Sequence, residues 1–259
     1  MGAPVLDLPR SVTLAAWLPH VRGDAALAER AAAGVTEDDE PHAVVADEGV
    51  PAPGTDLTAL LLAWGVPGVA VAAALPVPGD VVGVPVEAGA AAVEAGECVL
   101  VQTPVGAYAA VPHVEPFGSA SEPGNLVTWR IRAVSPWTLG VLAAVGSLAD
   151  AERELREALR TATEALDRLD VARWREDAVA ALASLRAEPD VRTLPAGLEP
   201  RRARVLALAA RLRVVVDLAT VDDGGAVNLW QADQRRAALR HVDHAARRAI
   251  CAATLVVPA

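Results

Sequence analysis

The sequence predicts an α+β fold, with α/β as the alternative, in which an N-terminal mixed sheet with flanking helices precedes a C-terminal antiparallel helical bundle. Helical and strand-like patterns alternate through the first half of the chain, whereas apolar residues recur at helical spacing from Ser147 onward. The charge changes at the same place: residues 1–146 hold 5 Arg and 16 acidic residues, and residues 147–259 hold 18 Arg and 17 acidic residues. We therefore predict two domains, an acidic mixed-sheet domain over 1–146 and a helical bundle over 147–259.

The first half of the chain is predicted to alternate between strands and helices. Asp24 has the position of a helix N-cap, and a second helix is expected to be capped by Thr55 and to end at Gly65. Such alternation favours parallel strands joined by helices. After a Pro/Gly-rich loop over 76–89, three strand-like runs with short connections predict antiparallel hairpins that complete a mixed sheet. The expected strands and helices are, in order, a strand at 11–18, a helix at 25–33, a strand at 43–46, a helix from 55 to 65, and strands at 69–75, 97–102, 107–114 and 126–134.

The second half is predicted to be helical throughout. Ser147 and Asp150 have the spacing of a helix-capping pair, and the leucines and alanines that follow repeat every seven residues. The DDGG sequence at 222–225 is typical of the end of one helix and the cap of the next. Further helices are predicted at 171–185, 201–221 and 226–255, of which the one at 201–221 is apolar on most sides and so the most buried.

Composition narrows the class of protein. All 23 basic residues are arginine, which is typical of a GC-rich genome, so the number of arginines does not by itself indicate phosphate binding. Cys98 and Cys251 lack the spacing of a disulfide framework or a zinc site, which favours a reducing, cytoplasmic location. The uncharged run at 57–79 is long enough to cross a bilayer, but the GVPG sequence at 65–68 interrupts it. The first ten residues lack the basic and apolar regions of a signal peptide, so we expect no membrane association.

The loops that follow the first predicted strands are the candidate ligand-binding site. In a parallel sheet, ligands bind beyond the carboxyl ends of the strands. Carboxylates with a histidine there suit acid-base chemistry or a divalent cation. Capping and turn chemistry are the alternatives for the aspartates, and no glycine-rich phosphate loop or nucleophile elbow accompanies them. We therefore assign no catalytic residue, no metal and no cofactor. The candidate ligand-binding residues are His20, Arg22, Asp24, Asp47, Glu48 and Asp80.

The acidic run EDDE at 37–40, beside His42, is typical of a solvated loop, with a metal site as the weaker alternative.

The stretch RHVDHAARRAIC at 240–251 places two histidines, an aspartate and a cysteine on the last predicted helix. Helical spacing puts His244, Arg247 and Cys251 on the side opposite the apolar face. Zinc would need a third protein ligand besides His241 and His244. We therefore expect a polar stripe that is solvated or lies between domains.

Nucleic-acid binding by the last helix is the alternative interpretation. Arg236, Arg240 and Arg247 are predicted to share its outer face. The chain as a whole is acidic, however, and no aromatic residues for base stacking are interleaved with these arginines. Nucleic acid is therefore the least favoured partner.

Two pairs of stretches carry a resemblance to a known family. The first pair is LPVPGD at 75–80 with AGECVL at 95–100, and the second is DDGGAV at 222–227 with the final helix. In these stretches the chain resembles a family of uncharacterised proteins from high-GC actinobacteria, over most of its length. The resemblance implies a bacterial, cytosolic protein and assigns no activity and no site residue.

The sequence favours a non-enzymatic binding or protein-interaction module. This hypothesis expects a homo-oligomer or a protein partner bound through the helical domain. The alternative is an enzyme that uses the strand-end loops on a small ligand or a metal. In that case His20, Asp24, Asp47 and Asp80 must converge on one site.

Overall fold

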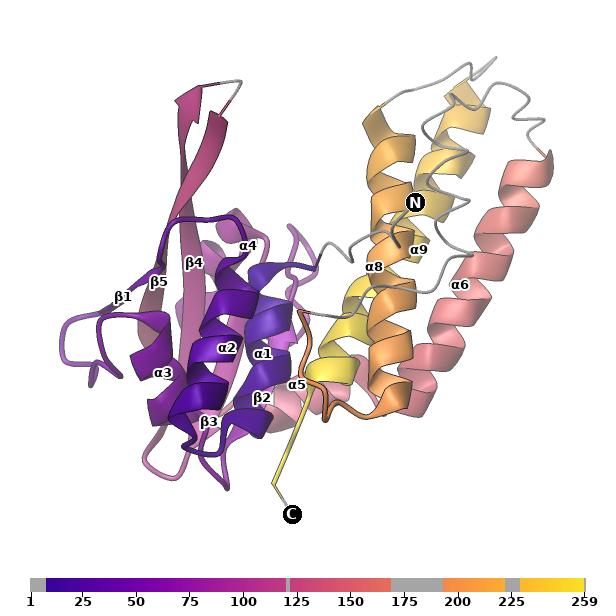
Figure 1. Cartoon of the computed structure of the whole chain (residues 1–259). Coiled ribbons are helices and arrows are strands. Elements are labelled where there is room, and N and C mark those ends of the chain that lie inside the picture. The colour runs from indigo at the N-terminus through magenta and orange to yellow at the C-terminus, as the bar shows by residue number, and fades with distance from the viewer. Residues whose placement is uncertain (1–7, 120–121, 169–192, 222–228, 259) are drawn as a thin grey trace. The chain divides into compact units, whose positions relative to one another are not determined.

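The computed structural model describes residues 8–119, 122–168, 193–221 and 229–258, which fall into two compact units. The sheet unit consists of Leu8–Val145 with two short additions, Arg192–Glu199 and Thr254–Ala259. Helices α6, α8 and α9 belong to the helical unit (Figure 1). The predicted α+β fold class is confirmed.

The sheet unit contains five strands in the order β1-β5-β4-β3-β2. β1 is parallel to β5, and every other neighbouring pair is antiparallel, so the predicted mixed sheet and its hairpins are confirmed. At the β2 edge, Val256 from the end of the chain pairs with Val71. The strands are β1 (Ala43–Ala46), β2 (Ala70–Ala74), β3 (Cys98–Thr103), β4 (Gly106–Ser119) and β5 (Glu122–Val134). The helices of this unit are α1 (Arg10–Val21), α2 (Ala25–Thr36), α3 (Leu57–Trp64), α4 (Val86–Ala95) and α5 (Thr138–Val145).

The first predicted strand is wrong, because residues 11–18 belong to helix α1. A continuous apolar run does not distinguish a buried strand from a buried helix. Here every residue from Ser11 to Leu18 is buried, since α1 packs against three strands and against α2 and α3. Its first turn has no side-chain cap of its own, and the Glu97 carboxylate accepts a hydrogen bond from the Ser11 amide at 2.8 Å instead.

Helices α4 and α5 were not predicted from the sequence. Helix α4 begins directly after Pro85, inside the loop predicted at 76–89. It ends at Gly96, a glycine with φ +74°. Alanine supplies most of its buried surface, through Ala88 and Ala92, so its apolar pattern is weak. The consequence is a helix on a face of the sheet where the sequence suggested only a loop.

The two faces of the sheet are covered unequally. Trp129 and Ile131 are fully buried on one face, whereas Arg130, which lies between them in β5, points to the other face and is exposed. On that second face α4 contacts β4 and β5, but Val45 of β1, which pairs with Arg130, remains 51% exposed. We call this second face the open face. By register it includes Ala43, Val45, Val111, His113, Thr128, Arg130 and Arg132.

The helical unit is held together by buried apolar residues and by arginine pairs. Arg201 of α8 pairs with Glu152 of α6, and the start of each helix lies at this contact, so α6 and α8 run in the same direction. Arg202 donates to the Ala253 carbonyl at 2.8 Å, which places the end of α9 beside the start of α8 and makes α9 antiparallel to it. These helices are α6 (Leu148–Arg168), α8 (Pro200–Val221) and α9 (Leu229–Thr254).

Several sequence predictions for the helical half can be compared with the structure. The Ser147 hydroxyl accepts a hydrogen bond from the Asp150 amide at 3.1 Å, which confirms the predicted cap. The helix predicted at 171–185 and the helix stop at 222–225 lie outside the described residues. No helix in the described part of the chain is long and apolar enough to cross a membrane.

Candidate functional site

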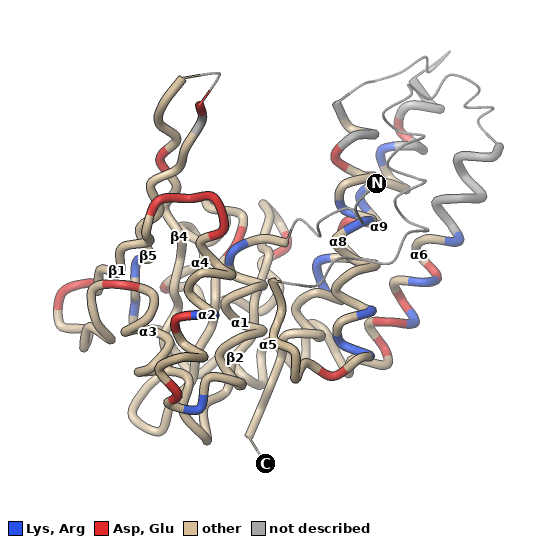
Figure 2. The backbone as a smooth tube through the Cα atoms, viewed as in Figure 1, with Lys and Arg blue, Asp and Glu red and all other residues tan. Residues whose placement is uncertain are grey.

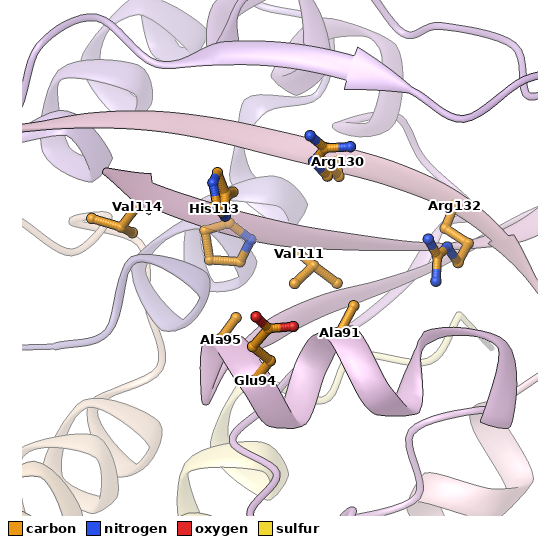
Figure 3. Close-up of a pocket in the computed structure, with 9 residues that line it drawn as sticks. Ala91, Glu94, Ala95, Val111, His113, Val114, Arg130 and Arg132 are labelled. Atoms are coloured by element: carbon orange, nitrogen blue, oxygen red, sulfur yellow. The ribbon is translucent and has the colours of Figure 1, made fainter. Parts of the chain in front are cut away.

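A pocket of about 490 Å³ lies on the open face, between α4 and strands β4 and β5 (Figure 3). Small residues of α4 form one wall, so the strand side chains opposite them remain accessible. Figure 3 shows Arg130, Arg132 and His113 on the strand side and Glu94 on the helix side. The lining residues are Ala91, Glu94, Ala95, Val111, Pro112, His113, Val114, Arg130 and Arg132.

Arg132 is anchored at the β1 end of this pocket. Its Nε donates to the Asp47 carboxylate at 2.8 Å, and Nη1 donates to the Glu87 backbone carbonyl at 2.9 Å. The Glu87 carboxylate in turn accepts hydrogen bonds from the hydroxyl and the amide of Ser135, which lower the pKa of Glu87. Arg132 is therefore held in one orientation, and Asp47 balances part of its charge.

Arg130 differs from Arg132 in having a free guanidinium. It is exposed and forms no hydrogen bond or ion pair with any residue that the structure describes. His113 lies on the neighbouring strand, with Nε2 3.4 Å from the Glu115 carboxylate. A planar guanidinium with free donors beside a second, fixed arginine is suited to bind a carboxylate or a phosphate through paired hydrogen bonds.

The structure places His20, Arg22 and Asp24 together, but at the end of a helix and not at the end of a strand. Asp24 caps α2 by accepting from the amides of Ala26 and Leu27 at 2.9 and 3.1 Å, as its alternative interpretation predicted. Burial, followed by the charge of Arg22, lowers the pKa of His20.

The other candidate residues divide between the two edges of the sheet. Asp47 and Glu48 follow β1, and Asp80 follows β2, which forms the opposite edge. Three antiparallel pairings separate β2 from β5, so β2 runs opposite to β1, and β5, β4 and β3 lie between the two strands, which places their carboxyl ends about 19 Å apart across the sheet. The structure therefore does not bring Asp80 near Asp47. Of the predicted residues, Asp47 is the one that contacts the pocket, through Arg132.

A partly buried polar network lies on the covered face. Arg10 donates to both carboxylate oxygens of Asp39, at 2.5 and 2.9 Å, and Asn125 donates to the same group at 2.9 Å. His42 lies 3.2 Å from Asp39 through Nε2, and its Nδ1 accepts from the Trp129 indole at 3.1 Å. Because both ring nitrogens are engaged and burial lowers its pKa, His42 is a neutral structural residue and not an accessible base.

This network corrects part of the prediction for the acidic run at 37–40. Glu37, Asp38 and Glu40 are exposed, as expected of a solvated loop. Asp39 is not, because its carboxylate is turned inward to Arg10.

The last helix also differs from its prediction. Arg247 is 3% exposed and donates to Asp243 at 2.7 Å, and Cys251 is fully buried, so neither belongs to a solvated stripe. Burial raises the pKa of Cys251 to about 12, which leaves its thiol protonated. Arg236 and Arg240 are exposed, and they share no outer surface with Arg247. Within the described ranges, no group of three or more His, Cys, Asp or Glu side chains is placed to hold a metal ion.

The pocket residues were missed at the sequence level, although a signal was present. In the sequence TWRIRAV at 128–134, Arg130 and Arg132 alternate with Trp129 and Ile131, as expected of a strand with one charged face. Residues 1–146 contain only five arginines. Two of them on one face of one strand indicated a cationic site.

The fold and the pocket define a protein in which an α+β unit with one open sheet face is followed by a helical unit. Residues 11–142 match the family model described as the N-terminal domain of the Rv1486c-like protein, and residues 149–251 match the model of its C-terminal domain. The chain therefore belongs to the Rv1486c-like family, a description that states no activity. No curated protein and no solved structure matches it.

Proposed function

We propose that the protein is a non-enzymatic binding module, and that the open face of its sheet binds the acidic side chains of a protein partner. The observation that carries this proposal is Arg130, whose guanidinium is free in a pocket that also contains the anchored Arg132. Guanidinium groups bind carboxylates through paired, charge-assisted hydrogen bonds.

The surroundings of the pocket favour a protein segment over a small anion. Val45, Leu126 and Phe117 lie on the same face by register, and they are 51%, 48% and 44% exposed. Exposed apolar side chains beside an arginine are typical of protein interfaces. This arrangement suits a segment with alternating acidic and apolar residues.

The proposal assigns binding to the predicted domain over 1–146. The partner surface that the sequence suggested for the helical domain, 147–259, stays a prediction. We also propose a cytoplasmic location, because the spacing of Cys98 and Cys251 in the sequence does not suit a disulfide framework. Among the sequence-predicted ligand residues, only Asp47 has a place in the proposal, because it orients Arg132.

The proposal is tested with a fluorescently labelled peptide, acetylated and amidated at its ends, of sequence Glu-Leu-Glu-Phe-Glu. We expect fluorescence polarisation to detect its binding to the dilute protein, and we expect Arg130→Gln to weaken the affinity about tenfold. Arg30→Gln, an exposed arginine of α2 away from the pocket, is the matched control and should leave the affinity unchanged. Equal affinity for the peptide in which Gln replaces every Glu would refute the proposal.

A further inference from the structure

Part of the β4–β5 hairpin extends beyond the rest of the sheet (Figure 1). β3 pairs with β4 only as far as Ala110, and β1 pairs with β5 only from Thr128 onward. The β4–β5 ladder itself continues to Ser119 and Glu122. We call residues 111–119 and 122–127 the arm. In the described chain the outer part of the arm, 114–119 and 122–127, is a two-stranded ribbon without a third strand. Such a ribbon is only marginally stable in water, so a partner that covers one of its faces would stabilise it.

The edges of the arm are unsuited to strand addition. Pro112, Pro116 and Pro123 have no amide hydrogen, and a proline in a ladder stands where its nitrogen points away from the paired strand. In the register, Pro112 faces Trp129, Pro116 faces Asn125 and Pro123 faces Gly118. These pairs belong to one alternating set, in which the backbone amides and carbonyls point outward, away from the partner strand. In agreement, the outward Asn125 carbonyl accepts from the Glu40 amide at 3.1 Å. Because these prolines remove outward donors from both edges, a partner is expected on a face of the arm.

The charges on the open face are separated along the arm. Arg132 and Arg130 lie toward the base, and Glu115, whose carboxylate is 3.4 Å from His113, and Glu122 lie toward the end. Figure 2 shows the same order along the hairpin, with basic positions near the sheet and acidic positions farther out. Arg130 pairs with Val111 and therefore lies four residues from Glu115 along β4, or about 13 Å at the usual rise of a strand. The two charges are therefore too far apart to pair within one chain.

We infer that the partner on the open face is a second copy of this chain, packed face to face on the arm. A two-fold axis across the strands near His113 and Thr128 reverses the direction of the second arm. This operation brings the acidic end of each arm beside α4 of the other copy, to the part of its base next to β1 that α4 leaves exposed, so that Arg130 of each copy meets Glu115 of the second copy. The exposed Leu126, which pairs with Glu115, and Phe117, two residues farther along β4, lie beside the charged groups and are covered. The inference rests on the proposed function, because it names the source of the acidic side chains.

A charge exchange tests this pairing. Sedimentation velocity over a concentration series measures the dissociation constant of the dimer for the unchanged protein, for Arg130→Glu, for Glu115→Arg and for the double variant. Each single variant places like charges opposite one another at two symmetric positions, so we expect its dimer to dissociate about tenfold more readily. The double variant should regain the original dissociation constant, because the opposite charges meet again with their positions exchanged.

Arg30→Glu and Glu29→Arg are the matched controls, since they make the same changes of charge on exposed positions of α2. Both should dimerise as the unchanged protein does. The inference is overturned if the unchanged protein is a monomer throughout the series, if neither single variant weakens the dimer, or if the double variant is no better than the single ones.

Peptide binding to Glu115→Arg separates this inference from the proposed function. The variant retains Arg130 and Arg132 and, as a monomer, leaves the pocket free, so it should bind the acidic peptide. If it binds the peptide and the unchanged protein is nevertheless monomeric, the second copy is wrong and the binding module stands. If Glu115→Arg binds no acidic peptide, the proposed function fails as well.

Discussion

Asp39→Asn is expected to destabilise the sheet unit, because Asp39 joins α1, the loop before β1 and strand β5. Burial alone would raise the pKa of Asp39, but the hydrogen bonds from Arg10, Asn125 and His42 outweigh burial and lower it from 3.8 to about 2. Asparagine keeps the shape of the side chain and removes the charge that these donors stabilise. The substitution therefore measures what the ionised carboxylate contributes.

The magnitude follows from the pKa of Asp39. Lowering the pKa of Asp39 from 3.8 to about 2 corresponds to about 2 kcal/mol. The Asp39 side chain is 10% exposed and Arg10 is 26% exposed, so solvent screens part of the interaction. We expect Asp39→Asn to lower the free energy of unfolding by about 1–2 kcal/mol at neutral pH. Asp38→Asn, on the exposed neighbour, should change it by less than about 0.5 kcal/mol.

The pH dependence gives a second test of the same substitution. The pKa of Asp39 is lower in the folded than in the unfolded chain, so its contribution is complete above the unfolded value near 3.8 and is lost as the pH falls toward about 2. Urea unfolding, followed by the NMR signal of the Trp129 indole that bonds to His42, measures the stability of this region. A difference between the two proteins that stays constant from neutral pH to about pH 2 would contradict the assignment.

The remaining predictions concern a glycine, a helix cap and a thiol. Gly83→Ala should cost more than about 2 kcal/mol, since φ is +77° and a Cβ would lie 2.8 Å from the Val141 Cα. Gly79→Ala, with φ +87° and open space around it, should cost only about 1 kcal/mol in the same urea assay. Ser147→Ala should lower the stability of the helical unit by about 1 kcal/mol in thermal unfolding, because the cap to the Asp150 amide is lost, and Ser147→Asn should restore most of it. Cys251 should react with iodoacetamide only after unfolding, since its thiol is buried and its pKa is raised to about 12; rapid alkylation of the native protein would show that this part of α9 opens.

Local features of the fold were predictable because each depends on residues a few positions apart. Asp24 and Ser147 cap the helices that follow them, and Gly65 ends α3, as their types and spacing indicate. The predicted cap of α3 was wrong by one residue, because Asp56 and not Thr55 accepts the hydrogen bond from the Ala59 amide. The runs that form β3, β4 and β5 were recognised by short turns between apolar segments. Each of these features needs contacts only within one helical turn or one hairpin.

Features that depend on distant residues were predicted incorrectly or not at all. The run at 11–18 is a helix because sheet and helices surround it, which its own apolar pattern does not reveal. Asp39 is drawn inward by Arg10, 29 residues away, and by Asn125, 86 residues away.

The sequence by itself determined the α+β class, the separation of an acidic part from an arginine-rich helical part, and the alternation of Arg130 and Arg132 with the buried Trp129 and Ile131. Only the tertiary structure decided which charged residues meet. The strand order puts β1 and β2 at opposite edges of the sheet, which separates Asp80 from Asp47, while α4 faces β4 and β5 and encloses the arginines in a pocket. The physical reason is that a strand's own sequence specifies which side chains share a face, whereas the neighbours of that face are selected by pairing between distant segments.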